Sequence, residues 1–281
     1  MSDHLQRGIS TSILDIHSSR HSFFYRALDT SKEVATRTTS VVFIALLFSI
    51  ATLSAQTADE LIAKYTKTIG GIEKIGAVKT LRRTGKFIGG GGFEAPILEE
   101  NKRPSMVRQD FTIQGLTGTT AYDGKVGWKI QPWDGKKDAE SLEEEEMKSI
   151  IEDADFDGPL VNYKLKGNKI EYLGLDPVDG TDTYKLKVTL ASGDSRVYYL
   201  DTDYYVPIKI DVKRTVRGAD REYEITLGDY KEVAGWYLPF SVETKVKGSQ
   251  GGSKVAYEKI EANVSIDDKR FAKPAVTPKP Q

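Results

Sequence analysis

The sequence contains no cysteine, and its only histidines, His4, His17 and His21, lie near the amino terminus. Without cysteine the chain can form neither a disulfide bond nor a lipid-modified cysteine, and its main part cannot build a Cys/His metal site. The chain also has no large excess of positive or negative charge, since its net charge is only −1. A nucleic-acid partner is therefore not expected, and neither a metal nor a cofactor is predicted.

Catalytic motifs are lacking as well. The sequence has no G-x-S-x-G elbow, and beyond His21 it has no histidine that could act as a base. A serine–lysine pair stays open, because no motif would mark one. The glycines at 89–92 are not followed by Lys-Ser or Lys-Thr, so they do not form a phosphate-binding loop. We therefore expect a protein that is not an enzyme.

Two acidic stretches have a possible function that we weigh against a solvated helix end. Residues 153–158 match the start of a calcium loop, which needs a glutamate at position 12, but Lys164 stands there. The glutamates at 143–146 are candidates for paired catalytic carboxylates. Four in succession point around most of a helix, so a solvated helix start near the positive end of the helix dipole is favoured.

One long hydrophobic run is present, at residues 41–50, preceded by Arg37 and followed by small residues up to Ala55. These are the three parts of a secretory signal peptide, which predicts cleavage near Ala55 and a soluble periplasmic protein. A retained membrane anchor extending to Leu53 is the alternative, although the run is short for a membrane span. The segment before this run is longer and more acidic than the amino-terminal part of a typical signal peptide. We therefore expect that the start at Met1 is wrongly assigned and that translation begins near Val34.

Alternating strands dominate residues 170–264. In three runs every second residue is apolar, while most of the residues between them are charged or polar. The apolar positions are Tyr184, Leu186, Val188 and Leu190; Val206, Ile208, Ile210 and Val212; and Trp236, Leu238, Phe240 and Val242. This period of two, with turn residues between the runs, predicts an antiparallel meander with one dry face and one wet face.

The region before the meander supplies helices and further strands. Thr57 and Glu60 form a capping box for a helix that carries Leu61, Ile62, Tyr65 and Ile69 and ends at Gly70-Gly71. A short helical turn is expected at 72–78. Strands are expected at 80–88, 93–101, 105–113, 117–122 and 126–130, in a sheet that continues into the meander.

The interval 133–168 is predicted to be the only long stretch without strands. A helix beginning at Glu143 places Met147, Ile150 and Ile151 on one face. Because its apolar face needs a partner, we expect this helix to lie across the open side of the sheet. A sheet of this length has more dry face than these few helices can cover.

Three short motifs resemble the LolA family of periplasmic lipoprotein carriers. They are Lys102-Arg103-Pro104; Tyr122-Asp123-Gly124-Lys125 with Trp128 and Pro132; and the ending Val264-Ser265-Ile266-Asp267-Asp268 with Phe271 and Pro274. The resemblance implies a mainly β (α+β) fold, in which a curved antiparallel sheet forms an incomplete barrel. Residues 56–274 would form this single domain, followed by a flexible tail at 275–281.

The resemblance also implies a function and a site. Helices would act as a lid over an apolar cavity for the acyl chains of lipoproteins or lipids, with Arg103, Met147, Ile150 and Ile151 at the lid. The residues expected in the cavity are Phe87, Met106, Trp128, Leu186, Ile208, Ile210, Trp236, Leu238 and Phe240. The protein would be a monomeric carrier and chaperone between an inner-membrane donor and an outer-membrane acceptor. The alternative is a lipid- or protein-sensing module of the same fold.

Overall fold

The structure is a computed structural model that describes residues 56–216 and 219–275. The predicted signal peptide and all but the first residue of the predicted tail lie outside the described residues. One antiparallel sheet contains all the strands described. They are β1 (Thr80–Ile88), β2 (Glu94–Lys102), β3 (Met106–Ile113), β4 (Leu116–Tyr122), β5 (Gly127–Gln131), β6 (Lys136–Ser141), β7 (Lys169–Leu175), β8 (Thr183–Thr189), β9 (Ser195–Asp201), β10 (Pro207–Val216), β11 (Ala219–Val233), β12 (Trp236–Val246) and β13 (Gly252–Ala262).

The strand order places the first and last strands in the middle of the sheet. The order is β6-β5-β4-β3-β2-β1-β13-β12-β11-β10-β9-β8-β7, so two series of hairpins join where β1 pairs with β13. The predicted continuity between the two halves of the chain is confirmed. The edge strands β6 and β7 are neighbours in sequence, and the segment between them must therefore connect the two edges of the sheet.

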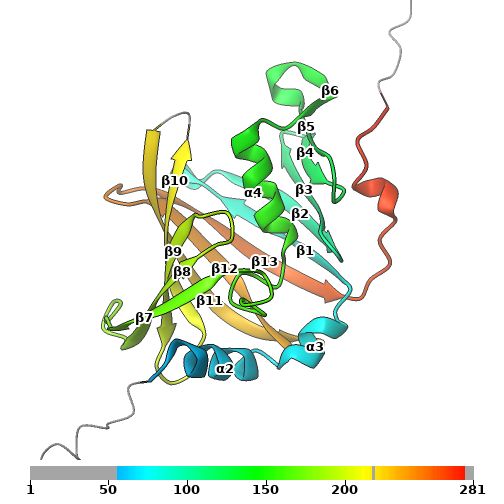
Figure 1. Ribbon diagram of the computed structural model, residues 1–281. Helices are drawn as coiled ribbons and strands as arrows, with labels where there is room; N and C mark the ends of the chain where they lie inside the picture. Colours follow the sequence, from blue (N-terminus) through cyan, green and yellow to red (C-terminus); the bar gives the residue numbers. More distant parts are fainter. Residues whose placement is uncertain (1–55, 217–218, 276–281) are drawn as a thin grey trace, which may run out of the picture. The chain divides into compact units, whose positions relative to one another are not determined.

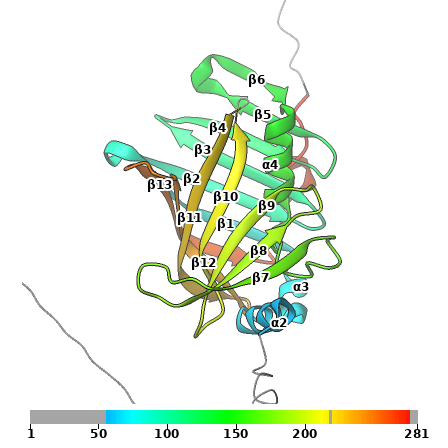
Figure 2. The same ribbon diagram turned by 60° about the vertical axis from the view of Figure 1, so that its left-hand side comes forward.

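The sheet is curved but does not close into a barrel. Figures 1 and 2 show β9–β11 curling around to face β2–β4, with helix α4 (Glu144–Ala154) between the two walls. Register shifts at Thr84/Gly85 and at Pro207/Lys209 interrupt the ladders, and such bulges increase local bending and twist. The prediction of a curved, incomplete antiparallel barrel is confirmed.

Three helices cover one face of the sheet, which we call the inner face. Helix α2 (Ala58–Thr68) begins at the predicted capping box, where the Glu60 amide donates to Thr57 Oγ1 at 3.2 Å and the Thr57 amide donates to Glu60 Oε2 at 2.9 Å. Helix α3 (Ile72–Ala77) follows after Gly70, whose φ is +124° and where a Cβ atom would lie 2.0 Å from the Gly235 carbonyl oxygen. Within the described residues, no helix is long and apolar enough to cross a membrane.

The helices pack on the inner face through two main apolar clusters. One cluster joins α3 and the end of α2 to β1, β12 and β13, and the other joins α2 to β8 and β9. The first contains Ile69, Ile75, Val78, Leu81, Val161, Trp236, Leu238, Phe240 and Ile260, and the second contains Leu61, Ile62, Leu160, Leu186, Val188, Tyr198 and Leu200. A smaller cluster of Val107, Ile150 and Ala154 lies under α4.

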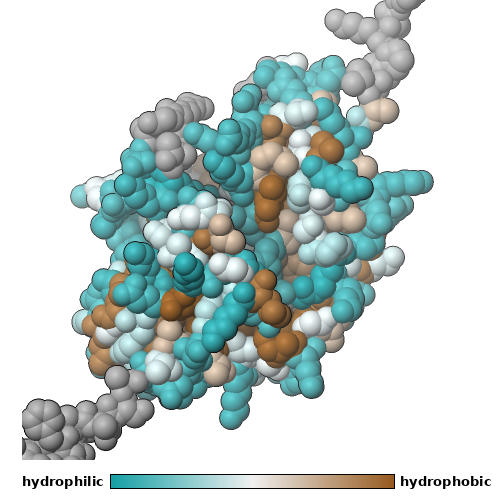
Figure 3. Space-filling model, in the orientation of Figure 1, coloured by the Kyte–Doolittle hydropathy of each residue, from teal (hydrophilic) through white to brown (hydrophobic). Residues whose placement is uncertain are grey.

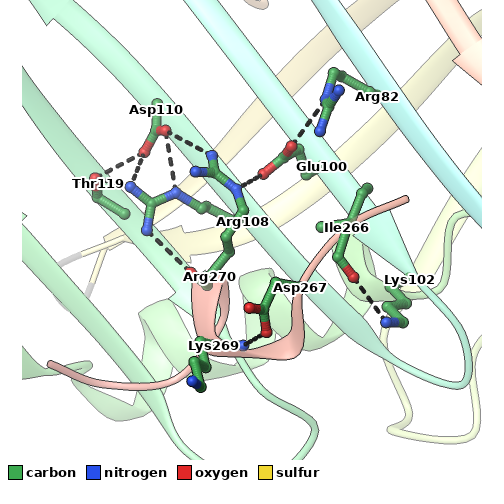
Figure 4. Close-up of polar contacts among 10 residues, drawn as sticks. All are labelled: Arg82, Glu100, Lys102, Arg108, Asp110, Thr119, Ile266, Asp267, Lys269 and Arg270. Carbon is green, nitrogen blue, oxygen red and sulfur yellow. Dashed lines mark hydrogen bonds and ion pairs between the residues drawn. The ribbon is translucent and has the colours of Figure 1, made fainter. Parts of the chain in front are cut away.

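The opposite, outer face of β1–β5 is covered by the carboxyl-terminal segment 263–275 (Figure 4). Trp128 and Phe271 are buried there, and the indole Nε1 donates to the Phe271 carbonyl at 2.8 Å. The buried Glu100 carboxylate accepts hydrogen bonds from Arg82, at 2.9 Å, and from Arg270. Both faces of this half of the sheet are therefore packed against protein.

One secondary-structure prediction was wrong. Residues 133–168 contain strand β6 in addition to helix α4, although we expected no strand in this interval. The sequence Lys-Lys-Asp-Ala-Glu-Ser of β6 has no apolar alternation. An edge strand can form through backbone pairing alone, here with β5, so its side chains need not be apolar on either face.

Candidate functional site

A cavity of about 340 Å³ lies between the inner face of the sheet, α2 and the segment that follows α4. Its apolar lining includes Ile69, Val107, Phe156, Leu160, Ile210, Leu227, Trp236, Leu238 and Val242. Its polar lining includes Tyr65, Arg83, Glu99, Asn101, Gln109, Asp153, Tyr198, Tyr230 and Tyr257. Figure 3 shows hydrophobic residues gathered on this side of the molecule along α4 and near α3, in a surface that is otherwise mostly hydrophilic.

Helix α4 is held to both walls of the curved sheet. On one side Ile150 packs against Val107 of β3, and Lys129 Nζ of β5 pairs with Glu146 at 2.5 Å. On the other side Glu152 accepts hydrogen bonds from Arg196 of β9 and from Arg214 of β10. The contacts to the second wall are polar, so they can be exchanged for water at lower cost than an apolar interface.

Arg103 fixes the segment that follows α4. Its Nη1 and Nη2 atoms form a two-pronged ion pair with the Asp157 carboxylate, at 2.8 and 2.5 Å. Its Nε and Nη2 atoms also donate to the carbonyls of Val78, at 2.7 Å, and Ile75, at 3.0 Å, and its guanidinium lies 4.6 Å from the centre of the Phe156 ring. Arg103 therefore connects the end of α3 to the segment over the cavity.

The three aspartates of the calcium-like sequence have separate partners. Asp157 binds Arg103, Asp155 binds Lys166 Nζ at 2.6 Å, and Asp153 accepts a hydrogen bond from Gln109 Nε2 at 3.1 Å. Within residues 56–216 and 219–275, no group of three or more His, Cys, Asp or Glu side chains is placed to hold a metal ion. The acidic stretch instead connects the segment over the cavity to its surroundings.

One wall of the cavity is polar. Glu99 Oε2 accepts hydrogen bonds from Tyr257, at 2.8 Å, and Arg83, at 3.4 Å. The Asp153 side chain is exposed at the cavity, although protein surrounds it on several sides. Burial, with a smaller contribution from the negative charge of Glu99, raises the pKa of Asp153 to about 6.

The raised pKa of Asp153 predicts a pH dependence of stability. The folded state holds this proton more tightly than the unfolded chain, so stability should fall as the pH rises from 3.8 through about 6. In Asp153→Asn this decrease should be absent, and the variant should be more stable than wild type at pH 7 by about 1 kcal/mol, less than the full shift because the cavity admits solvent. Urea unfolding at pH 4 and pH 7 measures this. A variant equal to wild type at both pH values would contradict it.

Five of the nine residues expected in the cavity lie in or beside it. Ile210, Trp236 and Leu238 line the cavity, while Leu186 and Phe240 are buried in the adjacent clusters. The remaining four do not line it. Phe87 lies elsewhere on the inner face, where its ring meets those of Phe93 and Phe111.

Trp128, Met106 and Ile208 are positioned by local strand geometry. Val107 faces inward, so its neighbour Met106 faces outward. Trp128 faces outward too, where it contacts Phe271. Ile208 lies at the register shift between Pro207 and Lys209, where the alternation of faces is interrupted.

The residues expected at the lid differ in exposure. Ile150 is 2% exposed and Met147 packs beside it, whereas Ile151 is 46% exposed. Arg103 contacts the segment after α4 rather than the helix itself.

Sequence reasoning missed Glu99, Gln109, Asp153 and Tyr257. On β2 and β3 polar residues occupy both faces, so alternation could not show which of them point inward.

No protein-family model and no curated protein matches this sequence. Solved structures nevertheless share its arrangement of an open half-barrel with helices over one face. A LolA superfamily protein from Nitrosomonas europaea is 14% identical, with a TM-score of 0.54 over 78% of this chain and 99% of its own. A domain described as an outer membrane lipoprotein-sorting protein from Vibrio parahaemolyticus is 12% identical, with a TM-score of 0.52 over 76% of this chain and 95% of its own.

A DUF1329 family protein from Desulfovibrio piger is also similar, at 10% identity and a TM-score of 0.53, over 76% of this chain and 96% of its own. At such identities the likeness establishes the fold alone. The chain therefore has a LolA-like fold, as the short sequence motifs predicted.

Proposed function

We propose that this protein binds the acyl chains of lipids or lipoproteins in its cavity and carries them through the periplasm toward the outer membrane. The observation that carries the proposal is a partly apolar cavity beside a segment that is held by the Arg103–Asp157 ion pair and by the buried side chains of Leu160 and Val161. The fold that it shares with a LolA superfamily protein and a lipoprotein-sorting domain supports the same function. Export by the predicted signal peptide would place the protein between a membrane donor and a membrane acceptor.

The size of the cavity sets the length of chain that it can enclose in this structure, where it is partly open to solvent. A volume of about 340 Å³ corresponds to roughly eleven water molecules at ~30 Å³ each, so it suits one alkyl chain of about ten carbons. Burying ten methylenes stabilises a complex by about 8 kcal/mol before opposing terms are subtracted. A longer chain, or a second one, would extend out of the cavity unless the segment beside it moved outward.

Cargo can be released only if the outward movement costs less free energy than burial of the acyl chain provides. The ion pairs of Glu152 with Arg196 and Arg214 join α4 to the second wall. Opening returns both partners of each pair to water, so the net cost of breaking these pairs is smaller than the cost of removing one partner by mutation. A lid that opens on this side while Ile150 stays packed on β3 would expose the cavity without unfolding the sheet.

Native mass spectrometry of protein purified without detergent, followed by organic extraction, tests the proposal. We expect bound lipid or acylated peptide in the wild-type protein. In Ile150→Asp, a carboxylate replaces a buried apolar contact, which costs several kcal/mol. The bound fraction should therefore fall by about tenfold or more, the equivalent of ~1.4 kcal/mol.

Ile151→Asp is the matched control, because it places the same charge one residue away at a position that is 46% exposed. It should retain wild-type occupancy. A wild-type protein that carries no lipid and also fails to bind a neutral fluorescent alkyl probe would contradict the proposed function. A bound lipid that changes the affinity for a protein partner but is not passed to acceptor membranes would favour a sensing role over a carrier.

A further inference from the structure

The polar wall of the cavity has more negative charge than positive charge. Arg83 is the cation among the lining residues, and it pairs with Glu99, while Asp153 is the second carboxylate that borders the cavity. Arg103 and Lys166 are already paired with Asp157 and Asp155. This leaves a net charge of one negative unit on the wall.

Two carboxylate oxygens on this wall have no donor among the described residues. Glu99 receives its hydrogen bonds at Oε2, which leaves Oε1 without one. Asp153 receives its hydrogen bond at Oδ2, from Gln109, which leaves Oδ1 without one. Both oxygens are open to solvent at the cavity, so a ligand that brings donors and positive charge can pair with them in place of water.

The apolar part of the cavity lies beside these carboxylates. Ile210, Trp236 and Leu238 border the same cavity as Glu99 and Asp153. A ligand with a polar end and an aliphatic chain can therefore satisfy both regions at once. A fatty-acid anion would fit the apolar region but would place its carboxylate against two others.

We propose that the cavity selects an amphiphile with a protonated primary amine, which donates to Asp153 and Glu99 while its alkyl chain lies along Ile210, Trp236 and Leu238. This inference rests on the proposed function and specifies the chemical class of its ligand. Asn101 and Gln109 fix the geometry, since Asn101 Nδ2 donates to the Asp153 backbone carbonyl at 2.9 Å and Gln109 donates to the Asp153 side chain.

Isothermal titration of the purified protein with three ten-carbon ligands at pH 7.5 tests this inference. Decylamine is cationic, decanol is neutral and decanoate is anionic, so the ligands differ chiefly in the head group. We expect decylamine to bind about tenfold more tightly than decanol, as charge-assisted hydrogen bonds form. Decanoate should bind more weakly than decanol.

Asp153→Asn should reduce the advantage of decylamine over decanol by about tenfold and leave decanol affinity within about twofold. Glu243→Gln is the matched control, because it removes an exposed carboxylate that pairs with Lys254 on the sheet surface. It should leave all three affinities unchanged.

The unmodified protein provides a second test. Decylamine stays protonated at both pH 5 and pH 7.5, whereas Asp153, whose pKa is raised to about 6, loses its charge at the lower pH. Charged and titratable groups that act on it are Glu99, Glu152, Arg214 and Tyr257, while Arg83 pairs with Glu99 on the same wall. The ratio of decylamine affinity to decanol affinity should therefore decrease severalfold at pH 5.

The possible outcomes separate the two proposals. Equal affinity for decylamine and decanol, or decanoate binding as tight as decylamine binding, would overturn the selection of amines and leave the acyl-binding function standing. Absence of binding by all three ligands, together with absence of co-purified lipid, would overturn both. The expected order of affinities, reduced in Asp153→Asn, supports both.

Discussion

Replacing Arg103 by leucine is expected to lower the free energy of unfolding by about 3 kcal/mol, the lower end of the ~3–5 kcal/mol seen when one partner of a buried ion pair is removed. Asp157 is 10% exposed and would lose its charged partner, while Arg103 is 25% exposed, which moderates the loss. The carbonyls of Ile75 and Val78 would also lose a donor. The segment over the cavity should then open more often.

Urea unfolding measures the loss of stability, and hydrogen exchange at residues 155–168 measures the opening. Adding Asp157→Asn to Arg103→Leu should recover part of the stability, because the uncompensated carboxylate is removed. Lys164→Met is the control, since its ion pair with Asp59 is exposed on both sides and should contribute no more than about 1 kcal/mol. Equal losses in Arg103→Leu and Lys164→Met would show that Arg103 does not fix this segment.

Phe271→Ala is expected to destabilise the protein by about 3–5 kcal/mol, the usual cost of removing a fully buried phenylalanine. Phe271 has no exposed surface, and its carbonyl accepts the hydrogen bond of the buried Trp128 indole. Loss of this anchor should also release the carboxyl-terminal segment from the outer face. Near-ultraviolet circular dichroism would report the changed surroundings of Trp128, and urea unfolding would give the free energy.

Phe93→Ala is the matched control for this prediction. Phe93 is 41% exposed at the end of the sheet, so the same substitution should cost much less, about 1 kcal/mol or below. If Phe271→Ala changed stability as little as Phe93→Ala does, the carboxyl-terminal segment would not be a structural part of the domain.

Most of the elements could be predicted because their signals are local. The capping box of Thr57 and Glu60 forms as expected, and the hairpins of β7–β13 follow one another in the sheet as the alternation and turns indicated. Strand β6 was missed because its charged sequence has no apolar face. Ile208 shows the same difficulty, because a bulge interrupts the alternation without a clear mark in the sequence.

The candidate site was less predictable than the fold. Trp128 has the hydrophobic character of a cavity residue, yet it lies on the outer face under Phe271, because a segment more than a hundred residues away covers that face. Glu99 and Asp153 are charged and would be expected on the outer surface, yet both border the cavity. Residue type alone could not separate these cases, since both faces of β1–β5 are covered.

The sequence by itself determined all the strands but β6, the helix starts and the short motifs, because these depend on residues that are neighbours along the chain. Only the tertiary structure decided which side chains meet in the cavity. Curvature brings β9–β11 opposite β2–β4, and the connection from one sheet edge to the other places Asp153 and Asp157 over the inner face. These contacts join residues that are distant in sequence, so no local pattern records them.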